Sequence, residues 1–251
     1  MTDVTEQKDI RVMVLAAGFG TRMQKAGETT PKPLVKLRGR PLIHYPLALL
    51  RKAGFNEVVV NLHHRADEIS GAVGSGEDFG LKINWLYEPE ILGTGGGIRN
   101  ANRVFPAKKW LTINADTVID LDLKKLIMFH NRFLPFATMA LCSQGSGKFN
   151  PIFADSLGMV RKIGTFPEIV SGEITLTRYA YCGVQIVSSR LLDCLPEGFS
   201  KVVEDGYFKA LGNKNPVLGF FSTGLWLTFD EPSSLPAVET EYGEALDRLS
   251  K

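Results

Sequence analysis

The chain has 251 residues, of which 44 % are hydrophobic and 22 % are charged. These proportions are ordinary for a globular protein and exclude a disordered chain, a collagen or a coiled coil as the main body. The 29 Lys and Arg residues against 27 Asp and Glu residues give a net charge of +2, which argues against a protein whose main task is to coat nucleic acid.

The cysteines and the apolar runs indicate the cellular compartment. The three cysteines, Cys142, Cys182 and Cys194, have no CxxC spacing, which favours a reduced protein over a disulfide scaffold or a zinc ribbon. Residues 1–10 are polar and contain no apolar stretch of the signal-peptide type. The longest apolar runs are far shorter than the roughly 18 residues that a membrane span needs. We therefore expect a cytoplasmic protein with no membrane partner.

Strands and helices are predicted to alternate, with short connections, from residue 11 to about residue 143. Short apolar runs indicate buried parallel strands, and apolar residues at helical spacing indicate helices. The alternation is typical of an α/β fold with a doubly wound, mostly parallel sheet. In chain order, strands are predicted at 11–16, 57–61, 81–87 and 109–114, and helices at 41–53, 65–73, 95–104 and 122–133.

The pattern changes after residue 143. Residues 144–187 contain several strand-like runs and no long helical pattern, which predicts a small β-rich lid insertion. Without a low-complexity linker or an internal repeat, we predict one domain over residues 1–251. The runs are 152–154, 159–161, 174–177 and 181–187, followed by helices at 189–194 and 201–211, strands at 217–221 and 225–229, and a C-terminal helix from about Ser233.

The strongest chemical signal is the stretch Leu15-Ala-Ala-Gly-Phe-Gly-Thr-Arg22, directly after the first predicted strand. Ligands of open parallel sheets bind just beyond the carboxyl ends of the strands. Glycines there let the backbone approach a ligand and direct N–H groups at an anion, while Arg22 offers a guanidinium group to phosphate. A tight turn that merely needs glycine is the competing interpretation.

A second cation, Lys32, lies between Pro31 and Pro33, so we expect it on an extended, stiffened segment. Taken alone, a lysine is most often a solvated surface residue. An arginine and a lysine that flank one glycine-rich loop favour a polyphosphate site instead.

With these residues in place, the sequence resembles the sugar-1-phosphate nucleotidyltransferases, also called nucleotide-sugar pyrophosphorylases. The resemblance rests on LAAGFGTRM, PKPL, the stretch Glu88-Pro-Glu-Ile-Leu-Gly-Thr-Gly-Gly-Gly97 and Asn114-Ala-Asp116, which follow in family order over most of the chain. The length is similar to members without a trailing β-helix, such as mannose-1-phosphate guanylyltransferase-like and N-acetylmuramate-1-phosphate uridylyltransferase-like enzymes.

The resemblance implies the Rossmann-like nucleotidyltransferase fold, with residues 1–143 as the nucleotide-binding half and 144–251 as the sugar-binding half with the lid. It also implies a role for each matching position. Arg22, Lys32 and Asp116 would be the catalytic residues, with Asp116 holding Mg²⁺. The nucleotide would contact Ala16, Ala17, Gly18, Gly20, Thr21, Glu88, Gly93 and Thr94, and the sugar would contact Gly95, Gly96 and Asn114.

The implied reaction is Mg²⁺-dependent transfer of a nucleotidyl group from a nucleoside triphosphate to a sugar 1-phosphate, with release of pyrophosphate. Such transfer depends on positioning and charge neutralisation, so no protein nucleophile is expected. Asp116 also suits a hard cation on chemical grounds. It follows a hydrophobic strand, at the sheet edge where ligands bind, and a hard cation prefers a carboxylate oxygen. A turn or helix-cap role is the alternative. The expected partners are the two substrates and no nucleic acid, in a monomer or small homo-oligomer.

The C-terminal part departs from the family pattern Trp-x-Asp-x-Gly-Thr-Pro, in which Asp is a second metal ligand. Here Thr228 occupies that position, and a neutral hydroxyl is a poorer magnesium ligand than a carboxylate. Asp230 could replace the missing ligand. The alternative function is therefore a weakened member that binds a nucleotide or nucleotide sugar as a sensor or subunit. A pyridine-nucleotide oxidoreductase is disfavoured because GFGTRM lacks the third glycine and Asn61, not an acid, closes the second strand.

Overall fold

The structure is a computed structural model that describes residues 9–20, 29–143, 150–166, 174–229 and 234–251. The chain forms two compact units, each assembled from separate stretches of sequence. The first unit contains the described residues of Met1–Arg11, Leu92–Thr112 and Lys124–Thr223, and the second contains those of Val12–Ile91, Ile113–Leu123 and Gly224–Lys251.

The second unit is built on parallel strands. Strand β1 (Ile10–Leu15) pairs with β4 (Glu57–Leu62), and β4 pairs with β5 (Lys82–Tyr87), in both cases in parallel. Strand β6 (Lys109–Asn114), which both units share, precedes β1 in the order β6-β1-β4-β5. The carboxyl ends of these strands meet at one edge, where the polar residues that follow them gather. Helices α2 (His44–Lys52) and α3 (Ala66–Val73) and the short helix η2 (Glu77–Phe79) lie in the connections.

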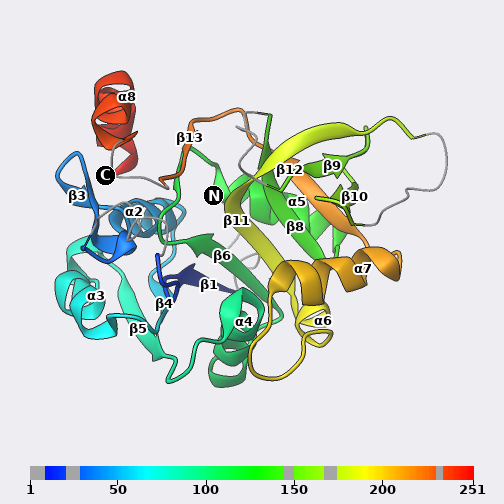
Figure 1. Cartoon of the computed structure of the whole chain (residues 1–251), viewed down its shortest axis with the longest axis horizontal. Helices are drawn as coiled ribbons and strands as arrows, with labels where there is room; N and C mark the ends of the chain where they lie inside the picture. The colour runs from blue at the N-terminus through cyan, green and yellow to red at the C-terminus, as the bar shows by residue number, and fades with distance from the viewer. Residues whose placement is uncertain (1–8, 21–28, 144–149, 167–173, 230–233) are drawn as a thin grey trace. The chain divides into compact units, whose positions relative to one another are not determined.

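Two small ladders and a C-terminal helix complete the second unit. The hairpin β2 (Lys36–Leu37) and β3 (Arg40–Pro41) follows the short helix η1 (Lys32–Leu34). Strand β13 (Trp226–Leu227) pairs antiparallel with β7 (Val118–Ile119). Helix α8 (Leu235–Leu249), drawn in red in Figure 1, ends the chain. Buried side chains from β2, α2, β7, α8 and the residues beside them form one core cluster: Val35, Leu37, Leu42, Tyr45, Val118, Phe229, Leu246 and Leu249.

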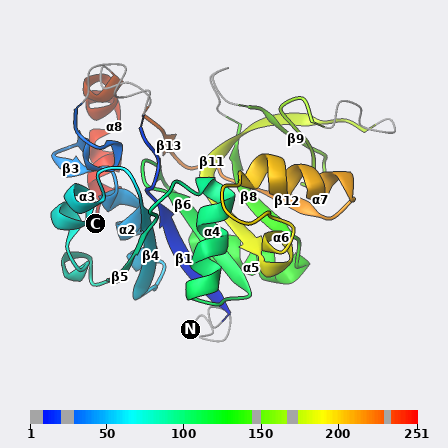
Figure 2. The same cartoon turned by 60° about the horizontal axis from the view of Figure 1, so that its bottom comes forward.

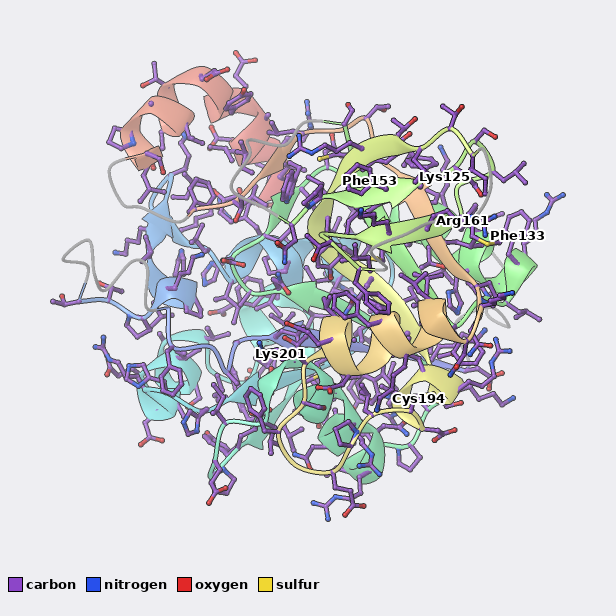
Figure 3. All side chains as sticks on the ribbon, turned by 45° about the vertical axis from the view of Figure 1, so that its right-hand side comes forward. Lys125, Phe133, Phe153, Arg161, Cys194 and Lys201 are labelled. Atoms are coloured by element: carbon purple, nitrogen blue, oxygen red, sulfur yellow. The ribbon has the colours of Figure 1, made fainter. Side chains whose placement is uncertain are left out.

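The first unit contains most of the antiparallel structure. Strand β11 (Thr177–Ser188) pairs antiparallel with β8 (Ala137–Cys142) and with β9 (Ile152–Ala154), and β9 pairs with β10 (Val160–Ile163). Strand β12 (Val217–Phe221) pairs in parallel with β8. Figure 3 shows Phe153 of β9 and Arg161 of β10 in this β-rich part. The helices of this unit are α4 (Gly93–Val104), α5 (Leu123–Phe133), α6 (Ser189–Leu192), η3 (Val202–Tyr207) and α7 (Phe208–Gly212).

The predicted fold class is confirmed: the protein is α/β, with a mostly parallel central sheet and helices between the strands. Three local predictions are corrected. The strand expected at 174–177 does not form over 174–176, and the strand expected at 181–187 instead begins at Thr177, because residues 177–179 pair with β9. The helix expected from residue 41 begins at His44, because Pro41 belongs to the β2–β3 hairpin. Lys32 begins a 3₁₀ turn instead of an extended segment, because Pro33 suits the first turn of a helix.

Within the described ranges, no helix combines the length and the apolar character that crossing a membrane requires.

Candidate functional site

The glycine-rich loop begins where β1 ends, in the second unit. Ala16 and Ala17 are buried, whereas Gly18 and Phe19 are exposed. Gly20 has a φ of +63°, a left-handed conformation that favours glycine. A Cβ added to Gly20 would also lie 3.2 Å from Cβ of Lys32. The loop backbone and the lysine are therefore close neighbours, as the polyphosphate interpretation requires.

Lys32 and Asp116 form an ion pair within the second unit. Their side chains are 16 % and 21 % exposed, so the pair is sheltered from bulk water but still within reach of a ligand. In such a setting, charges interact more strongly than they do at a fully exposed surface. The structure thus brings together two of the three predicted catalytic residues, and a phosphate group that entered would find a cation beside a carboxylate.

A buried polar network connects the three strand ends of the second unit. The N–H group of Ala16 donates to Oδ1 of Asn61 at 3.0 Å, and Nδ2 of Asn61 donates to Oε1 of Glu88 at 2.7 Å. Both Asn61 and Glu88 are 3 % exposed. Sequence reasoning overlooked Asn61 as a site residue, although one polar residue inside the apolar run Val58-Val-Val-Asn-Leu62 was the available signal. The network fixes the start of the glycine loop relative to Glu88.

The exposed side chain of Phe19, in the same loop, contacts two histidine rings. The ring of Phe19 contacts the rings of His63 and His64, with centroid separations of 5.5 and 5.7 Å. Nδ1 of His63 lies 2.8 Å from the backbone oxygen of Glu88. These contacts attach Phe19 and the histidines to the end of β5, beside the buried carboxylate.

Asn114 ends β6, and Asp116 lies in the turn that follows it. The N–H of Ala115 donates to the backbone oxygen of Leu15 at 3.0 Å, so this turn adjoins the start of the glycine loop. Strand β13 brings the stretch that precedes Thr228 alongside β7, which follows Asp116 closely. The C-terminal departure from the family pattern therefore lies near the predicted metal ligand.

The glycines of α4 belong to the first unit, where they pack against residues 198–202. The N–H groups of Gly95 and Gly96 both donate to the backbone oxygen of Ser200, at 2.9 and 3.2 Å. A Cβ on Gly93 would lie 2.6 Å from that oxygen, and one on Gly95 would lie 2.7 Å from Oγ of Ser200. Close backbone packing thus explains this glycine run. Contacts of Gly93, Thr94, Gly95 and Gly96 with a substrate stay a prediction.

The donor groups present suit a magnesium ion bound together with a ligand. Mg²⁺ is usually held by one or two carboxylates and by substrate phosphates instead of a complete protein cage. Asp116 supplies one such carboxylate beside the glycine loop. Among the residues that the structure describes, no group of three or more His, Cys, Asp or Glu side chains could hold a metal ion. Thr21, Arg22 and Asp230, which are also predicted site residues, lie outside the described residues.

Comparison with known proteins identifies the class to which this fold and site belong. The family model described as nucleotidyl transferase matches residues 11–140. The N-acetylmuramate alpha-1-phosphate uridylyltransferase of Neisseria meningitidis serogroup B is 30 % identical over 87 % of this chain and 92 % of its own length. The chain therefore belongs to the nucleotidyl transferase family, and the resemblance seen in the sequence is confirmed.

Two further similarities concern length and fold. A UTP–glucose-1-phosphate uridylyltransferase of Synechocystis is 29 % identical over 78 % of this chain, which spans only 56 % of that relative's length. The crystal structure of HddC from Yersinia pseudotuberculosis, complexed with GMP-PN, superposes with a TM-score of 0.77 at 24 % identity. The superposition covers 92 % of this chain and 99 % of the HddC chain, and it supports the fold.

Proposed function

We propose that this protein transfers a nucleotidyl group from a nucleoside triphosphate to a sugar 1-phosphate, giving a nucleotide sugar and pyrophosphate. The observation that carries the proposal is the ion pair between Lys32 and Asp116 beside Gly20 of the glycine-rich loop. Family membership supports the same reaction class, since the relatives named above are sugar-1-phosphate nucleotidyltransferases.

The chemistry follows from these groups. An oxygen of the sugar phosphate attacks the α-phosphorus, a new phosphorus–oxygen bond forms, and the bond to pyrophosphate breaks. The ammonium group of Lys32 offsets the negative charge of the triphosphate and of the leaving pyrophosphate, a role that we also assign to Arg22. The glycine loop contributes backbone N–H groups, because Gly18 and Gly20 allow close approach.

We assign magnesium to Asp116, with Asp230 as a second candidate ligand. When bound, Mg²⁺ would neutralise charge on the phosphate oxygens and orient the triphosphate. The carboxylate of Asp116 already lies next to a cation of the site. Asp116 can therefore bind a metal ion while Lys32 contacts the same phosphate group.

We assign recognition of the base to Glu88 and the buried network around it. The carboxylate accepts a hydrogen bond from Asn61, and the network positions the backbone of Ala16. A hydrogen-bonding group that is held in one orientation discriminates between bases by the donors and acceptors that each base presents to it.

The test is pyrophosphate release with Mg²⁺ across the four common nucleoside triphosphates. The sugar panel should include the 1-phosphates of N-acetylmuramate, glucose, mannose and D-glycero-D-manno-heptose. One productive pair that is lost in Lys32→Ala and kept in Lys36→Ala establishes the activity and names the product. Lys36 is the matched control because it carries the same charge on the adjacent strand β2 and is exposed.

A binding-only function is the second candidate, and Thr228 in place of a carboxylate is the observation that favours it. It predicts no pyrophosphate release with any pair. A nucleotide or nucleotide sugar would still raise the melting temperature, since any ligand that binds only the folded state stabilises it.

A further inference from the structure

The segments that carry Lys32 and Asp116 share one small core cluster in the second unit. Val35, whose N–H donates to the backbone oxygen of Lys32 at 3.2 Å, belongs to it, and so does Val118, which opens the strand after Asp116. The cluster is closed by C-terminal residues: Phe229, with no exposed surface, and Leu246 and Leu249 of α8. The packing of the C-terminal segment therefore bears on both charged residues.

The C-terminal segment also holds the Asp116 side by backbone pairing. Trp226 and Leu227 pair antiparallel with Ile119 and Val118, and the N–H of Asp120 donates to the backbone oxygen of Leu225 at 2.8 Å. These bonds tie residues 225–227 to the stretch that begins immediately after Asp116.

The Lys32 side is held by a clamp of side chains at the hairpin that follows it. The two-residue loop Arg38-Gly39 has φ values of +52° and +71°, as expected of a tight hairpin turn. Nε and Nη2 of Arg38 donate to the two carboxylate oxygens of Asp247 on α8, at 3.2 and 2.8 Å. The N–H of Arg38 also bonds to the Glu239 carboxylate, and Nη1 of Arg40 donates to the backbone oxygen of Ser250 at 3.0 Å. The second turn and the C-terminal end of α8 are thus attached to this hairpin, which lies beside the helix in Figures 1 and 2.

The hairpin transmits this attachment to Lys32 through the backbone. The N–H of Leu42 donates to the backbone oxygen of Val35, and the N–H of Ile43 to that of Pro33, at 2.9 and 3.0 Å. These bonds connect the hairpin directly to the 3₁₀ turn that carries Lys32.

We propose that residues 226–229 and helix α8 set the position of Lys32 relative to Asp116, with Arg38 as the positioning residue that fastens α8 to the hairpin. The proposal rests on the proposed function, because it assigns to this pair the handling of a triphosphate. Arg38 acts through the backbone of residues 33–43 and does not itself touch the substrate.

The experiment compares Arg38→Ala, Asp247→Asn, their double variant and the conservative Arg38→Lys with the wild-type chain. Lys82→Ala is the matched control, because it breaks another surface ion pair of the same unit, with Glu57 at 3.2 Å on β4. The readouts are kcat, KM for each substrate, the triphosphate dissociation constant without sugar phosphate, and hydrogen exchange at the amides of Val35 and Ile43.

We expect Arg38→Ala to lower kcat and to weaken triphosphate binding by about tenfold, since small displacements of a positioning group are costly. KM for the sugar phosphate and all values of Lys82→Ala should stay within about twofold, because the Lys82–Glu57 pair joins β5 to β4 and not α8 to the hairpin. Exchange at Val35 and Ile43 should accelerate in Arg38→Ala. The double variant should be no worse than the stronger single variant, and Arg38→Lys should recover part of the loss.

Two outcomes would overturn the positioning role. One is wild-type triphosphate affinity and unchanged exchange at Val35 and Ile43 in Arg38→Ala. The other is an equal loss in Lys82→Ala, which would indicate a general stability effect. Failure of the proposed function is a separate result, because it appears as absent turnover in the wild-type chain while the binding and exchange comparisons still decide on Arg38.

Discussion

The ammonium group of Lys32 and the carboxylate of Asp116 form an ion pair although the two residues lie on distant parts of the sequence. Lys32 is the first residue of η1, and Asp116 lies in the turn that follows β6. Their proximity places a cation and a possible metal ligand beside one glycine-rich loop, and it defines the first two predictions.

Asp116→Asn should reduce Mg²⁺-dependent pyrophosphate release by at least about a hundredfold, because a neutral amide is a poor magnesium ligand and no longer offsets Lys32. The fold should survive, since the side chain is partly exposed. The rate as a function of Mg²⁺ concentration, together with the melting temperature, checks this expectation. Asp67→Asn in the first turn of α3 serves as the control with the same chemical change. An Asp116→Asn enzyme with the wild-type rate would remove Asp116 from the metal site.

Lys32→Ala should weaken triphosphate binding and lower kcat, and Lys32→Arg should restore part of the affinity, because a cation is regained with a different shape. A loss of about one to two orders of magnitude is expected for one charge-assisted phosphate contact. Titration calorimetry with a triphosphate measures the affinity. Equal losses in the neighbouring Lys36→Ala variant would show that general surface charge, and not Lys32, attracts the triphosphate.

Glu88→Ala should cost about 1–3 kcal/mol of unfolding free energy, because it leaves the buried Nδ2 group of Asn61 without its acceptor. Glu88→Gln retains an acceptor and should cost less. If Glu88 contacts the base, both variants should change the ratio of rates among the four triphosphates more than the preference among sugar phosphates. Urea denaturation and a substrate panel separate the two effects, and an unaltered base preference in Glu88→Gln would leave Glu88 with a structural role alone.

The protein should lose stability on acidification through His130 of α5. Burial, together with the positive charges of the nearby Lys109 and Arg190, lowers the pKa of His130 from 6.5 to about 4. Between these two pH values the unfolded chain binds a proton that the folded chain excludes. The stability that neutral His130 contributes is therefore fully present above pH 6.5 and is lost as the pH falls towards 4. The expected loss is about 3 kcal/mol.

Urea denaturation between pH 7 and pH 4 measures this dependence. His130→Gln is the informative variant, because its amide can still bond to Oγ1 of Thr138, which lies 2.8 Å from Nδ1 of His130. The variant should lose the part of the slope that lies between pH 6.5 and 4. A slope identical to that of the wild-type chain would assign the acid sensitivity to other groups.

Gly96→Ala should destabilise the first unit by about 1–3 kcal/mol or more, since the added methyl group would collide with the backbone oxygen of Gly198. Gly71→Ala in α3 is the matched control, because its Cβ would meet no atom within 4 Å. It should be stabilising by up to about 1 kcal/mol, as alanine favours the helix. Thermal unfolding of both variants checks the prediction, and equal melting temperatures would contradict the packing role of Gly96.

Local patterns were sufficient for much of this protein. The apolar runs before Ala16 and at 57–61 predicted parallel strands correctly, because a strand that is buried on both faces is apolar along most of its length. The glycine loop and PKPL are each a short continuous stretch of sequence, so family membership could be recognised without the fold. Local patterns failed for the β2–β3 hairpin and β7, since strands of two residues carry no periodicity.

Only the tertiary structure decided which polar groups meet. The bonds from Ala16 to Asn61 and from Asn61 to Glu88 depend on the parallel register of β1, β4 and β5, which no one segment specifies. The fastening of α8 to Arg38 depends on how the C-terminal residues close a shared core. The sequence alone determined the chemistry that is present, because side-chain types are local. How these groups are arranged in the site was decided only by the tertiary structure, because burial and strand register join residues that are far apart along the chain.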